Sequence, residues 1–278
     1  MKSELSMSVF SDELLDQVEL NQCSMFNLFS RSPGVEIHQP EGDQNFFSIL
    51  TEAPLPIFNN ILRVRVSSSV IEEVVDSYTK SCKINNVPAL WWSSPLTSPS
   101  NLESVLIDHG WRSMDEIPAA MTAELKQIRA DDSFEIQSNK LLIKCVEDQN
   151  CKYQFSKLLT QVFELPSSAI EIVETMLFHP TCIEDHSFQH YLGFVDGNPV
   201  AAGSLFVKDD AAGIYNVCVS PVARKRRFGE MVTRHLLDVA NQLGCSRSVL
   251  QSSPMAMRLY EKIGFQQCGS FRLFLLNI

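Results

Sequence analysis

Residues 213–265 constrain the fold of this chain most strongly, because they alternate strand, basic turn, helix, strand and short helix. Residues 214–219 are apolar and rich in β-branched side chains, which is typical of a buried strand. Pro221 ends that strand, because proline cannot donate to a sheet ladder. A helix is predicted up to residue 243, since apolar residues recur there at three-to-four spacing and Gly244 stands at the position of a terminating glycine. This order of elements predicts an α/β fold.

The turn before this helix is strongly basic and reads Arg-Lys-Arg-Arg-Phe-Gly over residues 224–229. A helix N-terminus presents backbone N–H groups without intrahelical partners, together with the positive end of the helix dipole. These groups suit a phosphate, and four basic side chains beside them attract anions from a distance. A solvated basic turn is the alternative for such a cluster. The strand before it and the Leu-Tyr-Glu-Lys-Ile-Gly-Phe run over 259–265 favour an anion site.

The segment resembles the coenzyme-binding core of the GCN5-related N-acetyltransferases, the GNAT family. The family signature is [Arg/Gln]-x-x-Gly-x-[Gly/Ala] after a strand that ends in Val-x-Pro, and Val219, Pro221, Arg224 and Gly229 match it. Arg227 occupies the place of the middle glycine, so coenzyme binding is weaker than in the family or the loop differs. The second signature, Leu-Tyr-x-x-x-Gly-Phe, matches in full at residues 259–265. The resemblance is close over about residues 140–278.

This resemblance implies an α/β fold with a mixed sheet, in which residues 136–278 form a catalytic domain with the GNAT acyl-CoA N-acyltransferase fold. It implies acetyl-CoA as the cosubstrate, held by the end of the strand, the basic turn and the first helical turn. The implied coenzyme-binding residues are Val217, Cys218, Val219, Arg224, Lys225, Arg226, Arg227, Phe228, Gly229 and Glu230.

The resemblance also implies the catalytic groups. Tyr260 matches the tyrosine that donates a proton to the departing thiolate, and a packing role is the alternative. Asn216 either orients the acceptor or ties down the split between the central strands. Gly213 stands where many relatives have a carboxylate base, so an amine proton leaves through water or another group. His190, like His186 and Glu184 nearby, is expected at the solvated surface rather than in the acceptor cleft.

Residues 1–130 resemble the trailing half of a GNAT unit and are predicted to form a smaller, degenerate GNAT-like α/β domain. No basic glycine-bearing turn occurs there, so this half is expected to lack a coenzyme site. Its last strand is expected near residues 121–125, while residues 265–278 supply the closing strands of the second domain. The pair Trp91-Trp92 is interpreted as buried packing, with a ligand wall as the alternative.

Composition excludes several other classes of function. The net charge of −10 argues against general nucleic-acid binding. Eight scattered cysteines without a Cys-x-x-Cys pair indicate reduced thiols in a cytoplasmic protein rather than a disulfide framework or structural zinc. No metal is expected. No signal peptide or membrane-length apolar run is present, so no membrane partner is expected. Monomer and homodimer both remain open.

Two hypotheses about function follow. The first is an acyltransferase that moves an acetyl group from acetyl-CoA to a primary amine by direct attack in a ternary complex. The acceptor is a small-molecule or peptide amine, and amino acid, polyamine, antibiotic and protein amines all remain open. The second is a non-catalytic GNAT-like coenzyme-binding or scaffold protein, which the missing base and Arg227 favour.

Overall fold

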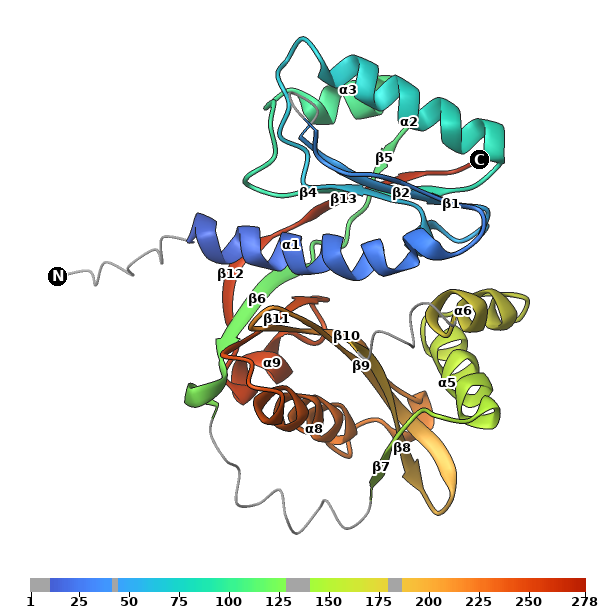
Figure 1. Cartoon of the computed structure of the whole chain (residues 1–278), viewed down its shortest axis with the longest axis vertical. Helices are drawn as coiled ribbons and strands as arrows, with labels where there is room; N and C mark the ends of the chain where they lie inside the picture. The colour runs from blue at the N-terminus through green and yellow to red at the C-terminus, as the bar shows by residue number, and fades with distance from the viewer. Residues whose placement is uncertain (1–10, 42–44, 129–140, 180–186) are drawn as a thin grey trace, which may run out of the picture.

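The computed structural model describes residues 11–41, 45–128, 141–179 and 187–278. Two sheets, one above the other, enclose the long first helix between them (Figure 1). None of the helices in these ranges combines the length and apolar character needed to cross a membrane. The predicted linker at 128–138, His186 and Glu184 fall outside the described residues, apart from Ile128.

The first half of the chain builds most of the upper sheet. Its elements in chain order are α1 (Asp12–Asn27), β1 (Val35–His38), β2 (Phe47–Thr51), β3 (Asn60–Leu62), α2 (Ile71–Asn85), β4 (Ala89–Ser93), α3 (Leu102–Asp108), β5 (Arg112–Ser113) and β6 (Ala119–Glu124). Helix α1 begins where Ser11 accepts a hydrogen bond from the backbone of Leu14.

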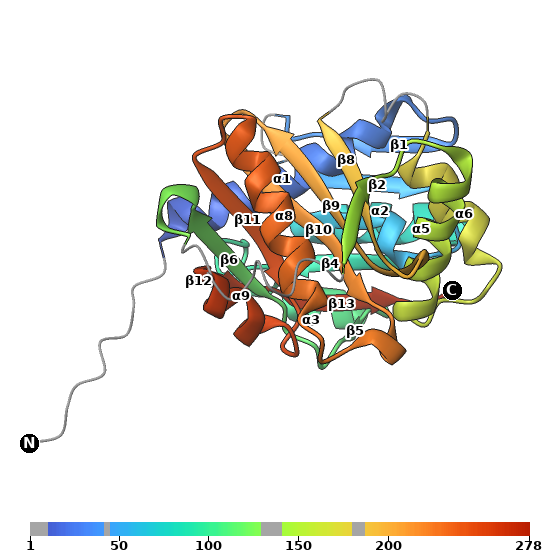
Figure 2. The ribbon, with the colours of Figure 1, turned by 90° about the horizontal axis from the view of Figure 1, so that it is seen from below.

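The second half builds most of the lower sheet. Its elements are β7 (Leu142–Cys145), α5 (Gln149–Val162), α6 (Ala169–Leu177), β8 (Phe188–Val195), β9 (Asn198–Lys208), β10 (Ala211–Val219), α8 (Phe228–Gln242), β11 (Arg247–Ser252), α9 (Met257–Ile263), β12 (Gln266–Ser270) and β13 (Arg272–Leu276). Helix α8 covers one face of this sheet (Figure 2), and α1 lies across the other.

The two halves exchange a strand, which corrects the predicted assignment of two strands. The lower sheet has the order β12-β6-β11-β10-β9-β8-β7, so β6 from the first half lies between β11 and β12. The upper sheet has the order β1-β2-β3-β4-β13-β5, so β13 from the end of the chain lies between β4 and β5. The strand expected near 121–125 and the last of the strands expected after 265, β13, therefore each complete the other half's sheet, whereas β12 stays in the sheet of its own half.

Helix α1 packs against both sheets, and its polar side chains form ion pairs or hydrogen bonds with residues of each. Glu19, only 2% exposed, accepts a hydrogen bond from Arg65 at 2.5 Å, and Asp16 pairs with Arg63 at 3.0 Å. These ion pairs fix α1 to the upper sheet. On its other side Asn21 accepts a hydrogen bond from the Tyr215 hydroxyl of β10 at 2.7 Å. The sequence pattern of a helix with one apolar face does not reveal that Glu19 is buried. A buried charge needs a partner, and Arg65 on the upper sheet provides it.

The tryptophan pair has the packing role that the sequence favoured. Trp91 is fully buried, and its ring meets Trp111 edge-on. Trp92 donates its indole N–H to Asn60 at 2.9 Å and packs edge-on against Phe271. Both rings therefore belong to the cores around the upper sheet.

The strand exchange predicts that the two halves do not fold separately. Residues 136–278 expressed alone lack β6, which leaves β11 and β12 without the strand between them. Residues 1–130 alone lack β13. We expect each fragment to be insoluble or to unfold without a cooperative transition, and the two co-expressed fragments to purify as one complex. Size-exclusion chromatography and thermal unfolding measure this, and a cooperatively folded 136–278 fragment would contradict it.

Candidate active site

The parallel strands β10 and β11 diverge in the middle of the lower sheet. They pair only where residues 211–213 lie opposite Arg247, Ser248 and Val249, although both strands continue. Strand β10 stays bonded to β9 on one side, and β11 stays bonded to β6 on the other. Beyond residue 213 the facing edges of the two strands therefore offer backbone groups to a ligand, as a sheet edge does.

A bulge in β10 lies at the start of this split. Tyr215 is opposite Ser204, while Cys218 is opposite Ala202, so Asn216 and Val217 form an irregularity in the ladder. Asn216 has a left-handed φ of 55°. Asparagine tolerates this conformation better than most residues do, which explains its place at the bulge.

A buried hydrogen-bond chain holds the bulge from within the sheet. The Asn216 amide donates to the Ser204 hydroxyl at 3.0 Å, and Ser204 lies 2.8 Å from His190 Nδ1. Burial lowers the pKa of His190 to about 3, although a hydrogen bond to the Leu177 carbonyl opposes the shift. His190 is therefore neutral at physiological pH, and it is a core residue rather than the surface residue that the sequence predicted. The Asn216 side chain thus fastens the bulge to β9, the strand on the other side of β10 from the split.

The basic turn follows β10 and enters α8, as the sequence predicted. Arg224, Lys225 and Arg226 are exposed, whereas Phe228 is buried in the core beneath them. The first amides of α8 have no intrahelical acceptor, so the turn keeps the features of an anion site.

Arg227 adopts a left-handed backbone conformation that favours glycine, and its side chain pairs with Glu230. Its φ is 62°, in the left-handed region. Its guanidinium donates twice to Glu230, with both distances 2.9 Å. Glu230 is almost fully buried and also pairs with Lys262 at 2.9 Å and Arg234 at 3.2 Å. Burial raises the pKa of Glu230, but the hydrogen bonds from these cations outweigh it and lower the pKa to about 2.

Tyr260 lies on α9. It is 7% exposed, and its ring packs against Phe265. Burial, and then the neighbouring Cys218 thiol, raise the pKa of Tyr260 well above its ordinary value. Cys218 is itself buried, and burial raises its pKa to about 12. Tyr260 is thus a protonated phenol beside the end of β10.

Other side chains occupy the space where a carboxylate side chain at position 213 would lie. A side chain at Gly213 would collide with the Asn21 amide of α1 and with the Tyr215 ring. Burial raises the pKa of Tyr215 far above its ordinary value, so its phenol remains neutral. Sequence reasoning missed Asn21 and Tyr215, because no local pattern signals that a helix from the first half reaches this strand.

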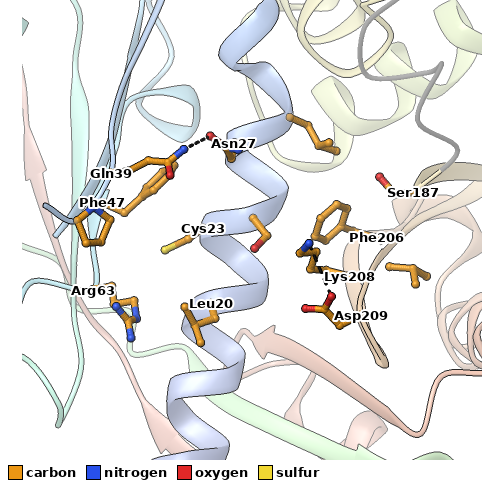
Figure 3. Close-up of a pocket in the computed structure, with 14 residues that line it drawn as sticks. Leu20, Cys23, Asn27, Gln39, Phe47, Arg63, Ser187, Phe206, Lys208 and Asp209 are labelled. Carbon is orange, nitrogen blue, oxygen red and sulfur yellow. Dashed lines mark hydrogen bonds and ion pairs between the residues drawn. The ribbon is translucent and has the colours of Figure 1, made fainter. Parts of the chain in front are cut away.

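A hollow of about 530 Å³ lies where α1 meets the β9–β10 turn (Figure 3). Asn27 and Gln39 are joined by a 2.8 Å hydrogen bond at one wall, and Lys208 and Asp209 form an ion pair at the other. Lys208 and Asp209 stand at the opposite end of β10 from its bulge. The hollow therefore lies beside α1 rather than at the divergence of the strands.

The corresponding position in the upper sheet lacks these features. After β3, an isolated bridge joins Arg65 to Ser98, and the segment then runs through Ser67-Ser68-Ser69 into α2. The first turn of α2 carries Glu72 and Glu73, which oppose a bound anion. Among the described residues, no three His, Cys, Asp or Glu side chains converge as metal ligands would.

Comparison with known proteins bears on the second half most directly. Residues 153–265 match the Acetyltransferase (GNAT) family. No curated protein sequence matches the chain.

Solved structures share the fold of the whole chain. A GCN5-related N-acetyltransferase from Kribbella flavida has a TM-score of 0.67 at 14% identity, with 92% of this chain and 94% of that one covered. A tandem GNAT protein from the clavulanic acid biosynthesis pathway has a TM-score of 0.60 at 9% identity, with 94% and 95% covered. A glucosamine N-acetyltransferase region of a fungal multi-domain GH3 β-N-acetylglucosaminidase has a TM-score of 0.64 at 13% identity, with 95% of this chain and 37% of that chain covered.

Replacing Arg227 tests its unusual backbone conformation. Arg227→Gly removes the steric cost of a left-handed residue and also the pair with Glu230, so we expect the free energy of unfolding to change by less than about 1 kcal/mol. Arg227→Ala removes the pair but keeps the Cβ, and should be less stable than Arg227→Gly by about 1–2 kcal/mol. Urea unfolding measures both variants. Equal stability of the alanine and glycine variants would mean that the backbone is not strained.

The charge on Glu230 should make stability depend on pH. Because its pKa is about 2 in the folded chain, against an ordinary 4.5, the carboxylate contributes roughly 3 kcal/mol above pH 4.5. This contribution is lost as the pH falls from about 4.5 towards 2. Denaturant unfolding of Glu230→Gln should thus show a deficit at pH 7 that shrinks below pH 4.5. Glu261→Gln, at an exposed position, is the control. A loss of stability in Glu230→Gln that does not change with pH would contradict the lowered pKa of Glu230.

Proposed function

Since residues 153–265 match the Acetyltransferase (GNAT) family, we propose that the chain is an acetyl-CoA-dependent N-acetyltransferase acting on a primary amine. The divergence of β10 from β11 beside the basic turn is the observation that supports this proposal. A linear ligand that carries amides and a diphosphate matches an open strand edge leading to an anion-binding turn.

In this proposal the coenzyme arm lies along the open edge of β10. Backbone groups of residues 217–219 pair with its amides, and the turn at 224–229 and the first amides of α8 hold the diphosphate. Arg224, Lys225 and Arg226 face this anion, whereas the Arg227 and Glu230 side chains hold one another and shape the turn. The acyl group then reaches the bulge at Asn216, and its sulfur lies near Tyr260.

The reaction is a direct attack of a neutral amine on the thioester in a ternary complex. The amine nitrogen bonds to the carbonyl carbon, the bond between that carbon and sulfur breaks, and Tyr260 supplies a proton to the departing thiolate and regains one from solvent. Tyr215 stays protonated, and its hydroxyl donates a hydrogen bond to the Asn21 amide oxygen, so it does not act as a base. The amine proton leaves through water. We also propose a cytoplasmic protein that acts without a metal.

The alternative is a coenzyme-binding protein without catalysis, which the filled space above Gly213 favours. Release of free coenzyme A thiol from acetyl-CoA, measured with a panel of amines, separates the two. The panel should hold amino acids, polyamines, aminoglycosides, a lysine peptide and glucosamine, the sugar in the name of the fungal relative. Calorimetric binding of acetyl-CoA without turnover of any amine would favour the binding protein.

Tyr260→Phe tests the proposed acid. The variant keeps the ring and its packing against Phe265 but removes the hydroxyl. With the best amine from the panel, we expect kcat to fall by at least about tenfold while acetyl-CoA affinity changes much less, which marks an interaction made in the transition state. Because burial raises the Tyr260 pKa, the wild-type rate should rise with amine deprotonation and not fall again up to pH 10.

Tyr191→Phe is the matched control. Tyr191 is also buried on the α8 face of the sheet, but its hydroxyl donates to Gln189. Its removal should leave kcat unchanged. A wild-type rate in Tyr260→Phe, with chemistry shown to be rate-limiting, would make Tyr260 a packing residue.

A further inference from the structure

A second hollow, of about 260 Å³, lies on the face of the upper sheet that α2 covers (Figure 1). Strands β1 and β2 line it on one side, and α2 lines it on the other. Glu36 lies opposite Leu50 in the β1–β2 ladder, and His38 lies opposite Ser48, so these four side chains share one face. Leu50 belongs to the core beneath α2, which identifies that face. The hollow is thus separate from the candidate active site of the lower sheet.

Two carboxylates line this hollow without a counter-ion. Glu36 lies on the edge strand β1, and Glu73 lies in the first turn of α2, and both are exposed. Neither forms an ion pair or a hydrogen bond with any residue that the structure describes. Two like charges at one concave site raise the local concentration of cations. The hollow therefore attracts a cation, whereas the basic turn of the lower sheet attracts an anion.

Two further polar groups at this hollow have no hydrogen-bond partner. Ser48 is only 7% exposed, and its hydroxyl makes no hydrogen bond within residues 11–41, 45–128, 141–179 and 187–278. His38 Nε2 is buried and likewise has no partner in these ranges. Buried polar groups are normally paired, so a bound ligand is one explanation for both. A serine hydroxyl and an imidazole nitrogen can each accept a hydrogen bond, so this ligand is expected to be a donor.

Aromatic rings form part of the same wall. The rings of His38 and Phe46 stack with their centroids 4.1 Å apart and their planes 18° from parallel. The Tyr78 hydroxyl donates to the Ile49 carbonyl at 2.9 Å, so this residue already has its polar partner. Ring surface beside carboxylates suits the carbon chain and the charged end of an organic cation. Inorganic Mg²⁺ and Ca²⁺ instead prefer a shell of oxygen ligands.

We propose that this hollow binds a small aliphatic primary amine through its ammonium group. Glu36 and Glu73 neutralise the positive charge, and the Ser48 hydroxyl accepts one of the three ammonium N–H groups. The alkyl chain packs against the ring of Phe46. The first half of the chain thereby has a ligand site of its own, which is independent of the proposed acetyl transfer.

Calorimetric titration of the full chain with 1,4-diaminobutane tests this proposal. The wild-type chain should bind this probe with a Kd below about 1 mM and should not bind 1,4-butanediol, which has the same carbon chain without charge. In the double variant Glu36→Gln, Glu73→Gln the affinity for the diamine should fall at least about tenfold, because two charge-assisted hydrogen bonds are lost. Ser48→Ala should weaken binding by about threefold, as the loss of a neutral acceptor does.

Glu72→Gln is the matched control. Glu72 is an exposed carboxylate beside Glu73 in the first turn of α2, but it does not line the hollow. The control removes a negative charge from the same turn, so it should bind the diamine as the wild type does. Because the substituted glutamates are exposed, the thermal unfolding midpoints without ligand should match that of the wild type.

Four results would overturn the proposal and leave the proposed function intact. The first is the absence of diamine binding to the wild-type chain. The second is wild-type affinity in the double variant, which would place the amine elsewhere. The third is equal weakening in Glu72→Gln, which would reduce the effect to general charge attraction. The fourth is displacement of the diamine by an equal concentration of MgCl₂, which would assign the carboxylates to an inorganic cation.

Discussion

The exchange of β6 and β13 is the constraint on which the rest of the structure depends. Strand β11 keeps a full ladder to β6 on its outer side, and β10 keeps its ladder to β9. Both strands are anchored from outside, so they stay in the sheet where their facing edges separate and leave backbone groups of those edges unpaired. The open edge of β10 therefore relies on a strand from the other half of the chain. The first half of the chain is therefore part of the frame of the candidate site.

Side chains of helix α1 also link the two halves of the chain. Its ion pairs bind it to the upper sheet, while Asn21 reaches the strand that bears the bulge. Helix α1 keeps only a few exposed residues, among them Glu13 and Leu20, so its buried polar groups need partners on both sheets. Each of these partners fixes the helix in rotation and in register. The geometry of β10 near its bulge is thus set by packing between the halves.

Much of the site could be predicted because it is local in sequence. The strand, turn and helix around residues 213–243 follow from periodicity, proline and glycine. The strand exchange could not be predicted, since alternation identifies a strand but not the neighbour with which it pairs. His190 was misplaced because nothing in its sequence signals that it meets Ser204. Arg227 was judged by its residue type, whereas its partner Glu230 and its left-handed φ explain how it is tolerated.

The contact between Gly213 and Asn21 couples one position in each half of the chain. A side chain added at position 213 would meet the Asn21 amide and the Tyr215 ring, so it would need these side chains to move. The Tyr215 hydroxyl in turn donates a hydrogen bond to Asn21, so a change at position 21 also reaches β10. Substitutions at positions 21 and 213 are therefore expected to be non-additive, as they are for residues in contact.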